Sequence, residues 1–172
     1  MNDTQEPFRF KLKPAIKTKW LEDLRSGDFE QTQEVLFDGE AYCCLGVLSV
    51  QMAKLGACGW REQAVYGMKL FPGMFSEEAI SSTDLPLSVV EAITKDPLPL
   101  ENDIELRSLM VAIPVLYTDL QTVKLSSGRQ LPTEAENDIT IGYKDHRYIT
   151  LAVLNDDLYT FAEIADVIEQ LL

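Results

Sequence analysis

The sequence is poor in the side chains on which most catalytic and metal-binding sites depend. Its 172 residues include one histidine, His146, and three cysteines. Basic side chains are also scarce, with 15 lysines and arginines against 28 aspartates and glutamates, which gives a formal net charge of −13. Binding to nucleic acid depends on a dense face of basic side chains that displaces counterions. The charge balance therefore excludes a general nucleic-acid-binding surface, and it equally disfavours anionic membranes.

Long hydrophobic runs are absent as well. No stretch of the sequence approaches the roughly 20 apolar residues that span a bilayer, and the polar segment from Met1 to Arg9 lacks the apolar core of a secretory signal. The composition, 46% hydrophobic and 9% aromatic, is typical of a folded globular protein. We therefore expect a single domain over residues 1–172, with flexible residues 1–8 and a variable middle at 57–138.

The three cysteines, Cys43, Cys44 and Cys58, make a poor disulfide framework. Their number is odd and two of them are adjacent, so that in a strand these two would point to opposite faces. Adjacent cysteines also cannot easily hold one metal ion together with the distant His146 in tetrahedral geometry. We expect reduced and buried thiols, no bound metal and no cofactor.

A catalytic pair of Cys44 and His146 is the alternative use of these residues. A cysteine nucleophile needs a base within hydrogen-bond distance, and Cys44 lies near the expected start of a helix, where the dipole lowers a thiol pKa. However, Cys44 belongs to the apolar string Tyr-Cys-Cys-Leu-Gly, whereas His146 belongs to a polar, turn-like string. The residues favour a non-enzymatic protein, and the enzyme alternative stays open.

Hydrophobic spacing predicts helices near both ends of the chain. After Pro14, apolar residues recur with a helical period as far as Leu24, and Ser26-Gly27 ends this helix. At the C-terminus, Thr160 and Glu163 form a capping box in front of a continuous apolar face. This last helix is expected to dock on the core.

Between the two end helices the sequence predicts shorter elements. Asp38-Gly39 lies between two apolar runs and indicates a β-hairpin over about residues 29–44. A helix is expected over 45–55, another over 85–93, and a break at Pro114. The expected fold is a single compact α+β domain, with a small antiparallel sheet that includes the hairpin and packs with N-terminal, central and C-terminal helices.

Negative charge is concentrated away from the N-terminus. Residues 1–25 have six basic and four acidic side chains, which leaves nine basic and 24 acidic ones for the other 147 residues. A dense acidic stretch begins at Glu77 and ends at Glu105, and we expect it to contact a partner with a basic surface. The expected contact residues are Glu77, Glu78, Asp84, Glu91, Asp96, Glu101, Asp103 and Glu105. The alternative is a solvated surface that serves solubility alone.

Aromatic residues are frequent in the loop-rich middle of the chain. Trp60, Tyr66 and Phe71 would line a pocket for a small molecule or a nucleotide, which they would hold by stacking on its base. Such a protein would either sequester the ligand or act on it with Cys44 and His146. Aromatic side chains in loops equally fill a core, and periodicity does not separate the two.

Two groups of residues form recognisable motifs. The first comprises Trp20-Leu-Glu-Asp-Leu-Arg-Ser-Gly27, then Gln31 or Gln33, then Tyr42-Cys-Cys-Leu-Gly-Val-Leu48. The second comprises Leu151-Ala-Val-Leu-Asn-Asp156 and Phe161-Ala-Glu-Ile-Ala-Asp-Val-Ile-Glu169. In this order the motifs resemble those of a family of small uncharacterised tailed-bacteriophage proteins, over about residues 14–56 and 148–172.

The resemblance implies expression in the cytoplasm of an infected bacterial host. Small acidic phage proteins without an enzymatic signature are often accessory factors that bind host proteins, and some inhibit host defences. The resemblance thus implies an accessory protein with a host-protein partner, and an anti-defence inhibitor is one form of this. A minor virion component is a further alternative, and a homo-oligomer stays open.

Overall fold

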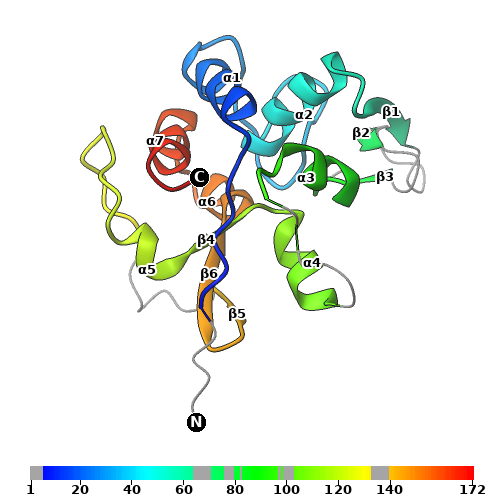
Figure 1. The fold of residues 1–172 in the computed structure, drawn as a ribbon. Coiled ribbons are helices and arrows are strands. Elements are labelled where there is room, and N and C mark those ends of the chain that lie inside the picture. The colour runs from blue at the N-terminus through cyan, green and yellow to red at the C-terminus, as the bar shows by residue number, and fades with distance from the viewer. Residues whose placement is uncertain are drawn as a thin grey trace.

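The structure, a computed structural model, describes residues 6–63, 71–75, 80–81, 83–96, 98, 103–132 and 140–172. These residues form seven helices and two three-stranded antiparallel sheets, which confirms the expected α+β class (Figure 1). The helices are α1 (Pro14–Arg25), α2 (Cys44–Lys54), α3 (Leu87–Ile93), α4 (Ile104–Met110), α5 (Tyr117–Leu120), α6 (Leu151–Asp156) and α7 (Phe161–Leu171). The strands are β1 (Gly59–Gln63), β2 (Phe71–Phe75), β3 (Ile80–Ser81), β4 (Pro114–Leu116), β5 (Ile141–Tyr143) and β6 (His146–Thr150).

The two end helices form as the sequence predicts. Pro14 opens α1, and Gly27, with a φ of 79°, follows its end. At α7, the Thr160 side chain accepts a hydrogen bond from the Glu163 N–H, while the Glu163 carboxylate accepts one from the Thr160 N–H. These two reciprocal bonds are the expected capping box. α7 packs against α1, so the C-terminal helix closes the core as predicted.

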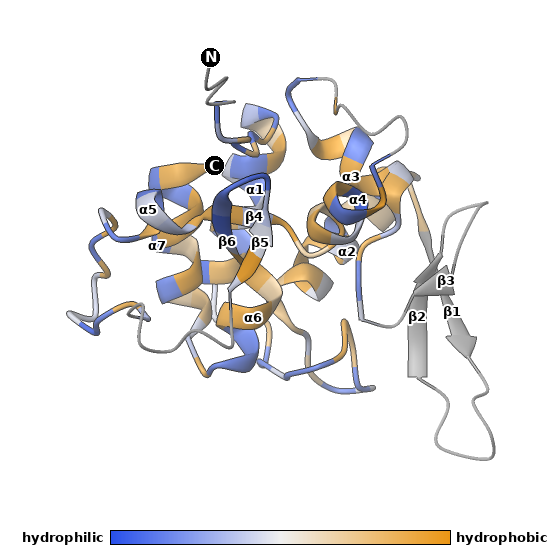
Figure 2. Cartoon of the chain, turned by 90° about the horizontal axis from the view of Figure 1, so that it is seen from below, coloured by the Kyte–Doolittle hydropathy of each residue, from blue (hydrophilic) through white to orange (hydrophobic). Residues whose placement is uncertain are grey.

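The sheet β4-β6-β5 has β6 in its middle, and α6 follows β6 without a break. Residues 148–150 in β6 are buried, and so are Val115 and Leu116 in β4. Pro114 interrupts the helical stretch, as predicted, because β4 begins at this residue. The helices meet around this sheet, where Figure 2 shows their apolar stretches.

The hairpin expected over residues 29–44 is only partly formed. Its turn is present: the Asp38 carboxylate accepts hydrogen bonds from the N–H groups of Glu40 and Ala41. However, the segment contains only isolated bridges, which join Tyr42 to Gln31 and to Phe37, and it contributes no strand to either sheet. The first arm runs parallel to Tyr42 at Gln31, and residues 31–34 also bond to the end of α6 and to Tyr159 after it.

Residues 8–13 cross the molecule as an extended segment between α3 and α7 (Figure 1). The N–H of Lys13 donates to the Ile93 carbonyl at the end of α3, and the N–H of Leu12 donates to the Leu172 carbonyl after α7. Phe10 and Leu12 are buried in the same hydrophobic cluster as the residues of both helices. The segment therefore links two helix ends that are far apart in the sequence.

Candidate functional site

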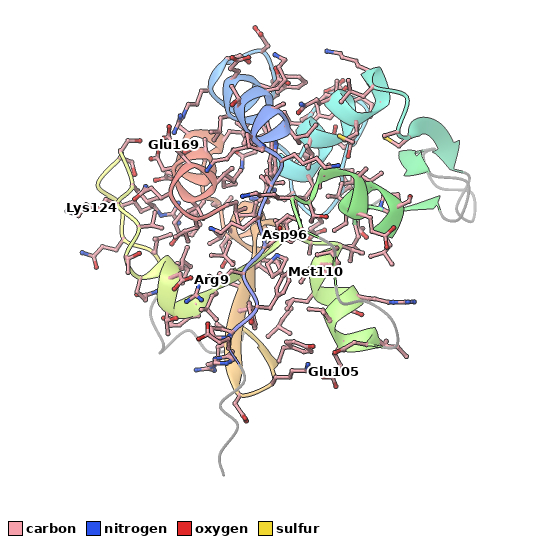
Figure 3. All side chains as sticks on the ribbon, in the orientation of Figure 1. Arg9, Asp96, Glu105, Met110, Lys124 and Glu169 are labelled. Carbon is pink, nitrogen blue, oxygen red and sulfur yellow. The ribbon has the colours of Figure 1, made fainter. Side chains whose placement is uncertain are left out.

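The structure describes only part of the acidic stretch that begins at Glu77 and ends at Glu105. Glu77, Glu78 and Glu101 lie outside the described residues. Asp84 precedes α3 and accepts a hydrogen bond from the Thr83 hydroxyl. Glu91 lies on α3, Asp96 follows this helix and Glu105 lies on α4, and all three are exposed. Figure 3 places Asp96 and Glu105 on the side of α3 and α4, whereas Glu169 on α7 lies across the N-terminal segment.

Asp103 has a structural role. Its carboxylate accepts a hydrogen bond from the Leu106 N–H and so caps α4, and it also accepts one from the Tyr143 hydroxyl in β5. The Tyr143 hydroxyl is the largest cause that lowers the pKa of Asp103, and the Leu106 N–H adds to it. Asp103 therefore holds α4 to β5. Unlike Glu91, Asp96 and Glu105, it is already bonded within the chain.

The basic side chains of residues 1–25 all bond to the chain itself. Three ammonium groups donate to helix-end carbonyls: Lys11 to Leu171, Lys13 to Ala92 and Lys17 to Glu169. Cations at these positions complement the helix dipole. The other three groups form ion pairs: Arg9 with Asp119, Lys19 with Asp23, and Arg25 with Asp166 and Glu169.

The carboxylates of the acidic stretch differ from these basic groups. Among the described residues, no hydrogen bond or ion pair engages the side chains of Glu91, Asp96 and Glu105. Each of the three is exposed to solvent. The exposed face of α3 and α4 therefore presents carboxylates that a basic surface could pair with.

Cys44 and His146 are not brought together. Cys44 is fully buried at the start of α2, where its thiol donates to the Leu151 carbonyl at 3.5 Å. Burial raises the pKa of the Cys44 thiol well above its ordinary value and raises that of Cys43 to about 11. His146 starts β6, and Figure 1 shows the β5–β6 hairpin at the opposite end of the molecule from α2. A protonated, enclosed thiol is a poor nucleophile, so this arrangement does not support the catalytic pair.

The cysteine motif instead builds a helix start. The Cys43 sulfur accepts a hydrogen bond from the Gly46 N–H, and the Cys44 carbonyl accepts one from the Trp20 indole N–H at 3.1 Å. A Cβ on Gly46 would lie 1.8 Å from the Leu36 carbonyl oxygen, so only glycine fits there. The motif is therefore explained by packing.

Asn155 joins the two motifs in the folded chain. It is fully buried, and its side-chain oxygen accepts hydrogen bonds from the Cys44 N–H and the Gln31 amide. Its side-chain nitrogen donates to the Thr32 carbonyl at 2.7 Å, while Gln31 also bonds to Tyr159 and Phe161. Sequence reasoning missed this network, although a glutamine and an asparagine inside two recognisable motifs were the available signal.

The described surface has several hollows, and the expected aromatic pocket stays a prediction, because the side chains that would line it lie outside the described part of the chain. A hollow of about 580 Å³ is lined by Gln31, Thr32, Gln33, Glu34 and Leu158, and one of about 460 Å³ by residues of the loop 121–131. A smaller one of about 150 Å³ lies beside Tyr143, His146 and Tyr148. Of the expected pocket residues, Trp60 lies in β1 paired with Met74 and Phe71 lies in β2 paired with Gln63, whereas Tyr66 falls outside the described residues.

The described residues contain neither a metal-binding cluster nor a membrane-spanning helix. No group of three or more histidine, cysteine, aspartate or glutamate side chains there could hold a metal ion. None of the helices in that part of the chain has the length and apolar character needed to cross a bilayer.

The fold defines an α+β protein built around a central three-stranded sheet. A family model described as a domain of unknown function, DUF8296, matches residues 12–172, so the chain belongs to this family. The match begins within the N-terminal segment and includes every helix and strand named above. Neither a curated protein nor a solved structure matches the chain.

Proposed function

We propose that the chain is a protein-binding accessory protein, with no catalytic role, that docks on a basic surface of its partner. The observation that carries this proposal is the unequal use of charge. All six basic groups of residues 1–25 bond within the chain, whereas Glu91, Asp96 and Glu105 extend exposed carboxylates. Complementary charge of this kind increases association rates and discriminates between partners.

The partner is a host protein in the cytoplasm of an infected bacterium. This part of the proposal rests on the resemblance of the two motifs to those of tailed-bacteriophage proteins. An accessory protein that binds a host protein and thereby inhibits a defence is the specific form that we propose.

Affinity capture with the tagged chain from bacterial lysate, followed by reconstitution with the purified partner, tests the proposal. The double variant Glu91→Gln/Asp96→Asn should retain less partner than the wild type, because two charge contacts are lost. The control Glu30→Gln/Glu40→Gln removes two exposed carboxylates outside the stretch and should bind like the wild type. Equal loss in both double variants would contradict docking through α3 and the segment that follows it.

Two further measurements test the alternatives. A thermal-shift screen with nucleotides should give no large shift, and a large one would replace the proposal with a ligand-binding function. Detection of the chain in purified phage particles would replace it with a virion role.

A further inference from the structure

A second surface of the molecule has properties that the monomer does not explain. It comprises residues 103–107 of the α4 start and residues 141–147 of the β5–β6 hairpin, and we refer to it as the α4–β5 surface. The two parts contact each other and are joined by the hydrogen bond from the Tyr143 hydroxyl to Asp103. In Figure 1 the hairpin forms the lower end of the described molecule.

β5 is an edge strand whose outer backbone groups are centred on Gly142. The sheet order is β4-β6-β5, so β5 has a strand neighbour on one side only among the described residues. The two-residue turn Lys144–Asp145 has positive φ at both positions, as in a type I′ hairpin, which makes Tyr143 and His146 a hydrogen-bonded pair. Pairs alternate along an antiparallel ladder, so the N–H and C=O of Gly142 point away from β6.

Nothing in the described part of the chain requires a glycine at position 142. The other glycines whose surroundings are described have either a left-handed φ or, at Gly46, a carbonyl oxygen in the way of a Cβ. At Gly142 the φ is not left-handed, and a Cβ would meet nothing within 4 Å. Glycine in a strand weakens the strand and often marks a site where another backbone approaches closely.

Each of the two parts of the α4–β5 surface contains one exposed isoleucine. Ile104 is 77% exposed and directly follows Asp103, while Ile141 is 45% exposed and lies two residues before Tyr143, on the same side of β5. They are two of only four large hydrophobic side chains counted as exposed among the described residues; the others are Leu55 and Leu158. Exposed apolar side chains on the same surface as an edge strand are typical of a surface that another chain covers.

The charges on the α4–β5 surface are balanced. It contains three carboxylates, on Asp103, Glu105 and Asp145, and three basic groups, on Arg107, Lys144 and Arg147. Two copies of a chain with a net charge of −13 repel each other over most orientations. At this surface the local charges do not add to that repulsion, and a two-fold axis would place the acidic groups of one copy near the basic groups of the other.

We propose that the α4–β5 surface binds a second copy of this chain. The β5 strands of the two copies pair antiparallel about a two-fold axis at Gly142, where each Gly142 N–H donates to the Gly142 carbonyl of the other copy. The two sheets then become one six-stranded sheet, and Ile104 and Ile141 are covered. Because the edge is short, the dimer is reversible and forms with increasing concentration.

Sedimentation equilibrium of the full chain over a wide concentration range tests this proposal. The apparent mass of the wild type should increase with concentration, from the chain mass of 19.4 kDa towards twice that mass. The variant Ile104→Lys/Ile141→Lys should stay at the mass of one chain, because two charges replace the covered apolar pair. The matched control Leu55→Lys makes the same change on a residue that is 64% exposed at the end of α2, and it should dimerise like the wild type.

A backbone variant tests the strand pairing itself. Gly142→Pro removes the outward N–H, which an edge strand tolerates, and it should abolish the dimer while circular dichroism stays unchanged. If this variant does not fold, hydrogen exchange of wild-type residues 141–143 replaces it, and exchange should slow as concentration increases. A wild type that stays at 19.4 kDa at every concentration, or exchange that does not respond to concentration, would overturn the proposal.

These outcomes are separate from those of the host-partner proposal. The variants that test the dimer leave Glu91 and Asp96 intact, and the variants that test the host partner leave the α4–β5 surface intact. A wild type that stays monomeric but captures the partner shows that the dimer proposal has failed, whereas a wild type that dimerises but captures no partner shows that the host-partner proposal has failed.

Discussion

Residues 1–25 and residues 84–105 use charge in opposite ways. In the first region each of the six basic side chains bonds to α1, α3, α5 or α7. Among the described residues of the second region, Glu91, Asp96 and Glu105 are exposed and make no side-chain bond, whereas Asp84 bonds to Thr83 and Asp103 caps α4. The comparison separates charges that hold the fold from charges that are open to a partner. Net charge alone does not make this distinction.

The N-terminal region has the larger energetic role because it also supplies a buried anchor. Trp20 is fully buried, and its indole N–H donates to the Cys44 carbonyl. Trp20→Ala should lower the free energy of unfolding by about 3–5 kcal/mol, which urea denaturation measures. Trp20→Phe keeps most of the aromatic ring but leaves the Cys44 carbonyl without its hydrogen bond. This variant should lower the free energy of unfolding by about 1–3 kcal/mol. If both variants lower the free energy of unfolding by less than about 1 kcal/mol, Trp20 is not a buried anchor of the fold.

The next largest effect is expected at Arg25. Its guanidinium bonds to Asp166, whose side chain is 12% exposed, and to Glu169. Arg25→Met leaves the mostly buried carboxylate of Asp166 without its ion partner. It should lower the free energy of unfolding by about 1–3 kcal/mol. Lys54→Met, which removes an exposed cation at the end of α2, is the control and should change stability little. If Arg25→Met and Lys54→Met lower the free energy of unfolding equally, the ion pair of Arg25 with Asp166 does not stabilise the fold as proposed.

The pH dependence of stability sharpens the same contact. Burial on its own would raise the pKa of Asp166, but hydrogen bonds from Ser126 and Arg25 outweigh burial and hold this pKa below its ordinary value. A carboxylate with a lowered pKa stabilises the fold above its unfolded pKa of about 3.9, and this contribution is lost as the pH falls through the folded pKa. The free energy of unfolding should therefore fall as the pH drops below about 4. The fall should be smaller in Arg25→Met, and an unchanged slope in this variant would contradict the coupling.

A smaller effect is expected from the lysines that cap helix ends. The Lys13 ammonium donates to the Ala92 carbonyl in the last turn of α3 at 2.6 Å. Lys13→Met should lower the free energy of unfolding by about 0.3–1 kcal/mol, and salt should reduce this difference. The nearby Lys95 is exposed, and no described contact engages its ammonium group. Lys95→Met should therefore have no measurable effect on thermal unfolding.

The smallest effect on stability is expected in the acidic region. Glu91→Gln/Asp96→Asn changes two exposed side chains without described contacts. The change in the free energy of unfolding should stay within about 0.5 kcal/mol. A larger loss would mean that these carboxylates also hold the fold, and the comparison between the two regions would fail.

The sequence predicted those elements whose signals are local. Pro14 and Gly27 bound α1, Thr160 and Glu163 cap α7, and β4 begins at Pro114, because each of these features depends on neighbouring residues alone. The segment 29–44 was different. Its turn at Asp38-Gly39 is local and formed, but Gln31 bonds to Asn155 and Tyr159, which are far away in the sequence. The local sequence pattern could not show that residues 31–34, the first arm of the expected hairpin, bond to these distant residues and not only to the second arm.

The candidate sites were less predictable for the same reason. Spacing could not show that Lys11 and Lys17 bond to α7 carbonyls, or that Asp103 caps α4 and bonds to Tyr143. Apolar context did indicate the burial of Cys44. The open edge at Gly142 depends on sheet order, which the sequence pattern did not contain.

The salt dependence of partner binding tests the central claim most directly. Affinity for the captured host partner is measured at low and high salt for the wild type, for Glu91→Gln/Asp96→Asn and for Glu30→Gln/Glu40→Gln. At low salt the first variant should bind about fivefold to tenfold more weakly than the wild type, and the difference should shrink at high salt. The control should follow the wild type at both salt concentrations. Equal affinity of all three proteins at low salt would contradict the claim that the open carboxylates of this region recognise the partner.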